Sequence, residues 1–290
     1  MSSLAGISLD HVAVAVEQWS DAWPRYAVEL GGRWASGGLN VGFGPAQLEY
    51  ANGARIEVLQ PWRAEANPFL RRFLDRHGPG PHHMTFKVDD LEAALEAADH
   101  AGFSPVGVDL SDPGWKEAFL HPHEATGIVV QLAQAAGSWE SPPPEGFPTQ
   151  RTATPAALVR VTHAVAELSA GLALFEQLLS GRAVARGTGP DGSWDYVDLA
   201  WDRPPVLRVV APAATSPRND ELATWLGSLT GRLHHLAFAS QDTVAPAGST
   251  PADRVPGLLG PELPASVVEP ERNMGTRIVV GRAIAADPPK

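Results

Sequence analysis

The sequence predicts an α+β protein in which four βαβββ units are paired into two open-barrel domains. Two observations favour this fold class. Within the first half, a strand, a helix and further short strands occur twice in the same order, and the second half repeats that plan at a nearly constant spacing. A chain of 290 residues is also longer than one ordinary domain, so two domains that can each bury a core are expected.

The first half contains both copies of the unit. The first copy has a strand, LDHVAVAV, then a helix, QWSDAWPRYAVELGG, and strands ending in ARIEVLQP. The second has HHMTFKVDD, the helix DLEAALEAADHAGF, and strands containing AFLHP and TGIVVQLAQ. Asp90 is expected to cap that second helix and Gly102 to end it, because a short acceptor side chain suits an N-cap and glycine suits the residue after a helix.

The second half answers these segments one by one. VRVTHAVAEL matches SLDHVAVAV and GRLHHLAF matches GPHHMTF, and 152 residues separate His11 from His163 and also His83 from His235. The fourth unit departs from the plan at residues 240–264, where a Pro- and Gly-rich segment stands at the place of a helix. We therefore expect a partly remodelled second domain.

A linker separates the two halves. Residues 137–156, GSWESPPPEGFPTQRTATPA, are rich in Pro, Gly, Ser and Thr, which sustain neither a helix nor a strand ladder. The predicted boundaries are 1–136 for the first domain, 137–156 for the linker and 157–290 for a degenerate second domain.

Four strands of the first domain each carry one residue of a metal-ligand type. Side chains alternate between the two faces of a strand, so each strand has an apolar face for packing and a second face that bears one such residue. These residues are His11, Glu57, His83 and Gln131. If the domain curls into an open barrel, the second faces converge on one point.

Such a set suits a divalent ion. Two imidazoles, a carboxylate and an amide oxygen are ligands for Zn, Ni, Co, Mn or Fe(II). The repeat places His163, Arg208, His235 and Gly281 at the same positions of the second domain. Because a cation replaces the carboxylate and a glycine replaces the amide, we expect no metal there.

These residues can also be interpreted without a metal. Glu57 could pair with Arg55 on the same face, and Gln131 could simply satisfy a hydrogen bond. His82 is expected to point away from His83, as adjacent residues in a regular strand do. His163 and His235 are then expected to hold a water or each other.

In its repeated units and in these four residues, the chain resembles the vicinal oxygen chelate superfamily, which contains glyoxalases, bleomycin-resistance proteins and extradiol dioxygenases. The resemblance spans nearly the whole chain, and it is most specific at 82–132, where HHMTFKVDDLEAAL, AFLHPHEATG and IVVQL are similar to methylmalonyl-CoA epimerase. It implies glyoxalase-like domains, with His11, Glu57, His83 and Gln131 at the metal-ligand positions and with catalytic roles for Glu57 and Gln131.

Two features of the family pattern are changed. The last ligand is commonly a carboxylate, whereas here it is Gln131 and the carboxylate is Glu57 on another strand. The resemblance also places Asn40, in GLNVGFGP, where an epimerase is expected to have a basic carboxylate, and an amide cannot act as a base.

Three functions remain open from the sequence. The first is a divalent-metal-dependent lyase or isomerase that acts on a small oxygenated substrate through an enolate-like intermediate. The second is a non-haem Fe(II) dioxygenase, in which His11, His83 and one carboxylate would form a facial triad. The third is a binding or resistance protein without catalysis. His121, His123 and Trp62 are further candidates for contact with a substrate.

Composition limits the partners. The formal net charge is -11, so no basic surface for nucleic acid or an anionic membrane is expected. There is no cysteine, which excludes disulfides and thiolate chemistry. We expect a cytoplasmic protein, a monomer or a homodimer, whose partner is a small molecule.

Overall fold

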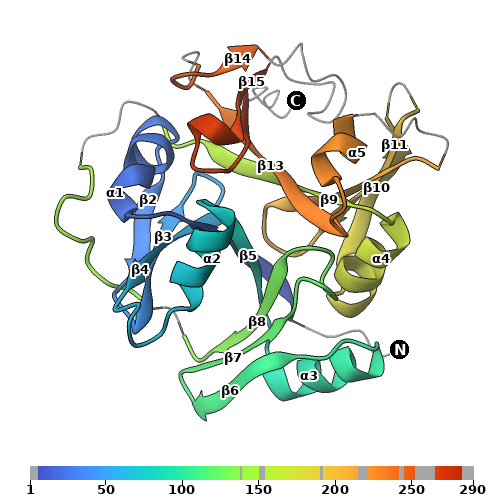
Figure 1. Ribbon diagram of the computed structural model, residues 1–290, viewed down its shortest axis with the longest axis horizontal. Coiled ribbons are helices and arrows are strands. Elements are labelled where there is room, and N and C mark those ends of the chain that lie inside the picture. Colours follow the sequence, from blue (N-terminus) through green and yellow to red (C-terminus); the bar gives the residue numbers. More distant parts are fainter. Residues whose placement is uncertain are drawn as a thin grey trace, which may run out of the picture.

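The computed structural model describes residues 6–137, 139–149, 154–189, 192–214, 221–241, 245–251 and 265–282. These residues form two eight-stranded mixed sheets with few helices, as the predicted α+β class requires. Figure 1 shows the first sheet in blue to green and the second in yellow-green to red. The strand orders, β2-β3-β4-β1-β5-β8-β7-β6 and β10-β11-β12-β9-β13-β16-β15-β14, correspond position for position, so the duplication predicted from the sequence is confirmed.

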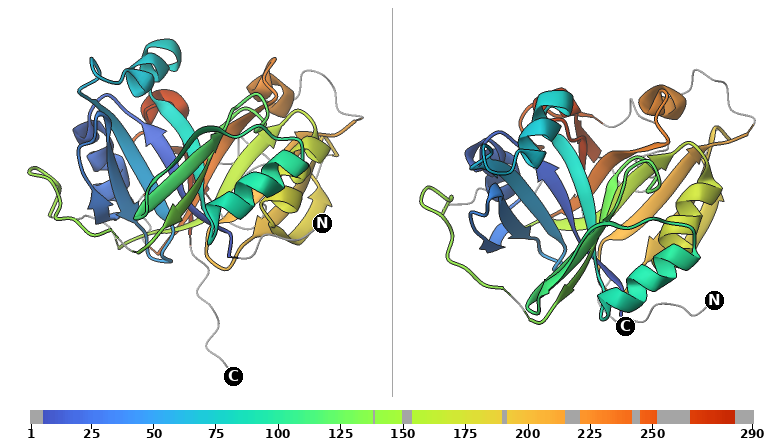
Figure 2. Two further views of the ribbon diagram at one scale, coloured as in Figure 1. Left: turned by 90° about the horizontal axis from the view of Figure 1, so that it is seen from below. Right: turned by 60° about the horizontal axis from the view of Figure 1, so that its bottom comes forward.

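The first sheet comes entirely from the first half of the chain. Its strands are β1 (Ser8–Ala15), β2 (Arg33–Gly37), β3 (Gly42–Glu49), β4 (Arg55–Trp62), β5 (Gly80–Lys87), β6 (Val106–Asp112), β7 (Trp115–Leu120) and β8 (Val129–Ala135). In the middle of the sheet, β1 runs parallel to β4 and antiparallel to β5, and β5 runs parallel to β8. The two views of Figure 2 show that the blue and green ends of this sheet bend toward each other as a half-barrel.

The second sheet repeats the arrangement. Its strands are β9 (Ala157–Val165), β10 (Arg182–Thr188), β11 (Trp194–Ala200), β12 (Val206–Pro212), β13 (Gly231–Ser240), β14 (Thr250–Pro251), β15 (Ala265–Val268) and β16 (Ile278–Arg282). The predicted remodelling at 240–264 falls largely on residues outside those that the structure describes.

Short helices connect the strands. They are α1 (Trp19–Ala22), η1 (Trp23–Glu29), α2 (Phe69–His77), α3 (Leu91–His100), α4 (Leu168–Leu172), η2 (Ala173–Leu178), α5 (Glu221–Leu226) and η4 (Pro270–Arg272). In α3 the predicted cap is present, because the Asp90 side chain accepts a hydrogen bond from the backbone N–H of Ala93 at 3.1 Å, and Gly102 follows the helix with a φ of 84°. The sequence prediction missed α2. Among the described residues, the helices are all too short or too polar to cross a bilayer.

One continuous apolar core joins the two halves. The apolar faces of both sheets contribute to it, and its fully buried members come from β1, β5, β9 and β12 alike. Between the two halves, the ring centroid of Phe86 lies 5.2 Å from that of Trp201 and 6.2 Å from that of Phe175. Burying this surface stabilises both halves together, and each half adds a smaller apolar cluster of its own.

The linker packs on the first sheet over its described part. The backbone oxygen of Ser141 accepts a hydrogen bond from the Trp34 indole at 2.7 Å, and its hydroxyl bonds both the N–H and the carbonyl of Gly37. Phe147 lies against the rings of Trp34 and Trp23. This segment therefore forms part of the wall around the open side of the half-barrel.

Candidate metal centre

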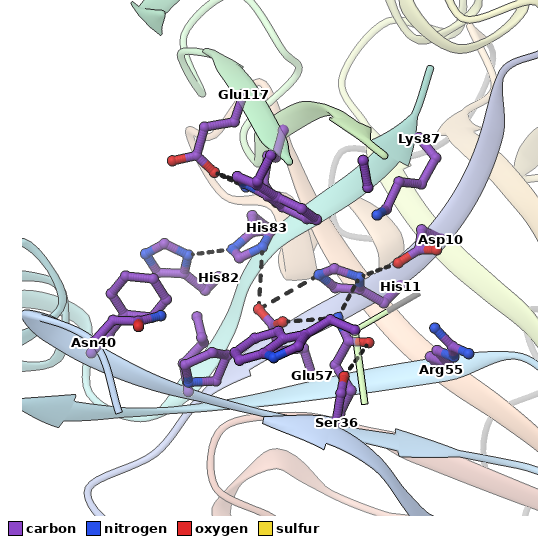
Figure 3. A pocket seen from close by; sticks show the side chains of 18 of the residues that line it. Asp10, His11, Ser36, Asn40, Arg55, Glu57, His82, His83, Lys87 and Glu117 are labelled. Atoms are coloured by element: carbon purple, nitrogen blue, oxygen red, sulfur yellow. Dashed lines mark hydrogen bonds and ion pairs between the residues drawn. The ribbon is translucent and has the colours of Figure 1, made fainter. Parts of the chain in front are cut away.

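The four central strands of the first sheet bring together the residues singled out from the sequence. His11 lies on β1, Glu57 on β4 and His83 on β5, all three are buried, and a ligand atom of each lies within 4.8 Å of the others. The Glu57 Oε1 atom is 3.5 Å from His11 Nε2 and 3.8 Å from His83 Nε2. Figure 3 shows the three side chains pointing toward one another inside the pocket.

The carboxylate of Asp10 holds the His11 ring. The β1–β5 register shifts between Leu9 and His11, and this irregularity lets adjacent residues face the same side, so that Asp10 Oδ2 reaches His11 Nδ1 at 2.8 Å. Burial lowers the pKa of His11, but the Glu57 and Asp10 carboxylates raise it overall to about 9. The surroundings of His11 therefore favour a positive charge at this point of the cavity.

His83 presents a ring nitrogen with no partner. Its Nδ1 lies 2.8 Å from Nδ1 of His82, while its buried Nε2 has no hydrogen bond among the described residues and faces Glu57. Burial lowers the pKa of His83 well below its usual value, and His82 and His11 add to the effect. A neutral imidazole with a free nitrogen has the form that a metal ligand requires.

The prediction that His82 points away from His83 was wrong. Ala13 pairs with His83 and Val14 with Pro81, so His82 is the extra residue of a bulge in β5, and a bulge turns consecutive side chains toward one face. His82 therefore lines the same cavity as His83. Burial lowers the pKa of His82 to about 4, so it contacts His83 as a neutral ring.

Glu57 does not pair with Arg55, the alternative that the sequence left open. Arg55 binds Glu49 instead, at 3.1 Å. Glu57 accepts a hydrogen bond from the Gln47 amide at 3.1 Å, and although burial raises its pKa, the neighbouring His11 lowers it below the usual value. The carboxylate is thus ionised and directed at the two histidines.

Gln131 lies beside this cluster on β8. Its Oε1 accepts a hydrogen bond from the Thr85 hydroxyl at 2.6 Å, and that hydroxyl lies 2.9 Å from His11 Nε2. Its Nε2 donates to Glu117 at 2.7 Å. The amide oxygen is therefore bound to the Thr85 hydroxyl beside the cluster, and its role as a fourth ligand stays a prediction.

The donors fit a divalent transition metal. Ligands bonded at about 2.0–2.2 Å to one ion lie no more than about 4.2 Å apart, and the distances from Glu57 to both imidazoles are within this bound. The unpaired Nε2 of His83 points at the same centre. Asp10 supports the site as well, because a carboxylate on the far nitrogen of a ligating histidine fixes the ring and its tautomer.

The cluster stands at the inner end of a cavity of about 1630 Å³. Its aromatic lining residues are Trp34, Phe43, Phe69, Trp115, Phe119 and Trp139. His121 and Asn40 also line it, whereas Trp62 and His123, two of the predicted substrate contacts, are not among its lining residues. The expectation that Trp62 lines the pocket is therefore not met. The cavity exceeds the ~300–1,000 Å³ of ordinary ligand pockets and has room for an extended substrate.

Comparison with known proteins identifies the fold family. The family model described as the Glyoxalase/Bleomycin resistance protein/Dioxygenase superfamily matches residues 10–119. The protein YqjC of Bacillus subtilis (strain 168), whose function is uncharacterized, is 30% identical over 142 residues, which are 44% of this chain and 93% of that protein. The chain belongs to this superfamily.

Two proteins whose names describe an activity are also similar to the chain. Ethylmalonyl-CoA/methylmalonyl-CoA epimerase of Cereibacter sphaeroides is 29% identical over 131 residues, 43% of this chain and 96% of the epimerase. A mutant of 4-hydroxymandelate synthase from Streptomyces coelicolor covers 96% of this chain and 94% of its own, with a TM-score of 0.64 and 16% identity. The second likeness concerns the fold alone, and it extends over nearly the whole chain.

The register of the second sheet corrects the sequence alignment of its site positions. In the first sheet His11 pairs with Thr85 and Arg55, and the same places in the second sheet pair Arg160 with Ala237 and Val206. The residue equivalent to His11 is therefore Arg160, not His163. The sequence alignment erred because β9 is offset by three residues from the spacing that the matching letters suggest.

The fourth position is corrected in the same way. Gln131 pairs with Thr85 in the first sheet, and Val279 pairs with Ala237 in the second, so Val279 and not Gly281 takes the place of Gln131. Arg208 and His235 do occupy the places of Glu57 and His83. Among the described residues, the His11, Glu57 and His83 group alone has the arrangement of a metal cluster.

In the second domain, the residues that were matched to the metal-ligand positions have other hydrogen-bond partners. Arg208 forms two hydrogen bonds to Asp198, at 2.7 and 2.8 Å. His163 faces the opposite side, where its Nε2 donates to the backbone oxygen of Thr126 at 2.9 Å. His235 lies 3.1 Å from the Thr162 hydroxyl, so neither histidine holds the other as expected from the sequence.

Sequence reasoning missed several residues around the cluster, namely Asp10, Gln47, Thr85, His82 and Glu117. Alternation carried a signal for two of them, since Gln47 and Glu117 lie on the cavity-facing side of β3 and β7. Asp10 and His82 carried none, because bulges place them and bulges leave no periodic pattern.

Proposed function

We propose that the chain is a divalent-metal-dependent lyase or isomerase that acts on a carbonyl compound with an acidic hydrogen next to the carbonyl. The observation that carries the proposal is the buried group of His11, Glu57 and His83, with the Nε2 of His83 free to bind. The epimerase relative supports the reaction class, because its name describes inversion at such a carbon.

Each residue has a role that follows from its contacts. His11, Glu57 and His83 would hold the ion, and Gln131 would add its amide oxygen. When bound, the ion supplies positive charge that polarises a carbonyl oxygen and stabilises the negative charge that develops on it. Asp10 and Gln47 keep His11 and Glu57 in position, and the aromatic walls keep water from the reacting carbon.

A second candidate is a non-haem Fe(II) dioxygenase. Two histidines and one carboxylate with room beside them form the donor set that such enzymes use. Oxygen-dependent turnover with iron would favour this function over the first.

The test is metal analysis combined with a carbon-acid assay. The purified protein is dialysed against Zn, Ni, Co, Mn or Fe(II), its metal content is measured, and the loaded protein is incubated with methylmalonyl-CoA in D₂O. We expect one ion per chain and exchange of the α-hydrogen for deuterium, followed by mass spectrometry. A protein that retains none of these ions would contradict the proposal and favour a binding protein.

A further inference from the structure

The strand β7 (Trp115–Leu120) brings a carboxylate to the cavity that the ligand pattern does not include. Trp115, Glu117 and Phe119 lie on its cavity side, and all three line the pocket. Phe119 pairs in the sheet with Gln131, the residue that lies beside the cluster. Glu117 precedes Phe119 by two residues, so the two side chains are neighbours on the same face of β7. In the view of Figure 3, Glu117 and Glu57 lie on opposite sides of His83.

Hydrogen bonds hold the Glu117 carboxylate in place, and no cationic side chain among the described residues pairs with it. Its Oε2 accepts hydrogen bonds from the Trp115 indole at 2.8 Å and from the Gln131 amide at 2.7 Å. Among the described residues, no Lys, Arg or His forms an ion pair with it, and its Oε1 has no hydrogen-bond partner. One oxygen is therefore anchored, and the other is available to a bound molecule.

Hydrogen bonds connect this carboxylate to the cluster. Gln131 binds Glu117 through its Nε2 and Thr85 through its Oε1, and the Thr85 hydroxyl lies 2.9 Å from His11 Nε2. Glu117 thus contacts Gln131, the proposed fourth ligand, directly, and it is connected to His11 through the Gln131 amide and the Thr85 hydroxyl.

The other carboxylates that line the cavity are already engaged or lie at its rim. Asp10 binds His11, Glu57 faces the cluster, and Glu49 binds Arg55. Asp112 and Glu140 are exposed. Asn40 and Gln131, at the two positions where the family resemblance implies carboxylates, are amides. Glu117 is the carboxylate left in the inner cavity with a free oxygen.

We propose that Glu117 is the proton-transferring residue of this cavity, which restores the base missing at Asn40 from a different strand. The inference rests on the proposed function. The bond between the substrate's α-carbon and its hydrogen breaks, and the proton moves to a carboxylate oxygen of Glu117. The electron pair of that bond moves into the bond between the α-carbon and the carbonyl carbon, and the carbonyl oxygen takes up the negative charge. Return of a proton to the carbon regenerates the carboxylate.

The variant Glu117→Gln separates proton transfer from positioning. An amide oxygen still accepts hydrogen bonds from Trp115 and Gln131, so the local arrangement is retained while the basic group is removed. Glu96→Gln on the exposed face of α3 (Leu91–His100) is the matched control, since it changes the same charge far from the cavity.

The experiment measures two quantities for the metal-loaded proteins, the ions bound per chain and the rate of deuterium exchange into methylmalonyl-CoA across pH. We expect Glu117→Gln to bind the ion like the unaltered protein and to exchange the α-hydrogen at least about 10²-fold more slowly. Glu96→Gln should match the unaltered protein in both measurements.

The contrary outcomes differ from one another. Undiminished exchange in Glu117→Gln would overturn the role of Glu117 and leave the proposed function standing. Loss of the metal in that variant would also overturn it, because Glu117 would then act by holding Gln131. An unaltered protein that binds its ion but never exchanges the hydrogen would overturn the proposed reaction and the role of Glu117 with it.

Discussion

The two halves of the molecule share a fold and differ in the charge at its centre. The strand orders are the same, and both central sheets contain adjacent histidines whose Nδ1 atoms meet, His82 with His83 and His234 with His235. Around the first pair stand His11 and a carboxylate. Around the second stand Arg160 and Arg208, and their positive charges, with that of Arg277, lower the pKa of His235 further below the value that burial sets.

The histidine pair occurs at the same place in both sheets, whereas the groups around it differ. In both sheets a bulge on the central strand turns two consecutive rings to one side. The outer nitrogen of His83 is free, while that of His235 contacts the Thr162 hydroxyl and His234 contacts Arg277 at 2.8 Å. A metal is expected only where a nitrogen is free and a carboxylate faces it.

The largest expected effect comes from removing one histidine of each pair. His83→Ala should abolish stoichiometric metal binding, because it removes a ligand from a set of three or four, whereas His235→Ala should leave it intact. Isothermal titration with Co(II) measures both, and circular dichroism shows that each variant is folded. Equal loss in the two variants would contradict the assignment of the site to the first domain.

Much of this contrast could be predicted from the sequence, for a physical reason. Side chains alternate between the two faces of a regular strand, so Glu57, His83 and Gln131 could be assigned to the ligand-bearing faces of their strands from the order of the residues alone. The duplication gave the pairing of the units. The sequence did not reveal the register of β9. The match of His11 to His163 therefore assigned to the site a histidine that lies on the opposite face of the sheet.

The residues that support the site were harder to predict. Asp10 reaches His11 only because the ladder is irregular beside it, and a backbone irregularity has no sequence period. Glu117 lies in β7, for which the sequence analysis identified only the segment AFLHP, and no role was assigned to Glu117 from the sequence. The positions of such side chains depend on contacts between strands, which the residue pattern within one strand does not show.

A smaller effect is expected at His163, which the comparison places on the core side of the second sheet. Burial lowers its pKa to about 4, and its ring lies against Phe175. The unfolded chain takes up a proton near pH 6.5 and the folded chain does so only near 4, so the stability from the neutral ring is full above 6.5 and is lost as the pH falls toward 4. The shift corresponds to about 3 kcal/mol.

His163→Gln removes the titrating group and keeps a donor for the Thr126 carbonyl. Urea unfolding at several pH values should show a shallower loss of stability between pH 6.5 and 4 in this variant than in the unaltered protein. Between about pH 7 and 8 the two should run parallel. Identical slopes at acid pH would mean that His163 is not buried as a neutral ring, and that the second sheet is less closely packed on the first than described.

The smallest expected effect tests whether the first site owes its affinity to groups beyond the ligands. Asp10→Asn keeps the shape of the side chain and removes the charge behind His11, whereas the equivalent position of the second sheet, Val159, has no polar group. Loss of such a supporting carboxylate weakens metal binding about 10–100-fold. Competition with a chromophoric chelator measures the change, and Asp99→Asn on the exposed end of α3 is the control. An unchanged affinity in Asp10→Asn would assign Asp10 to packing alone, and the contrast between the halves would then lie entirely in the ligands.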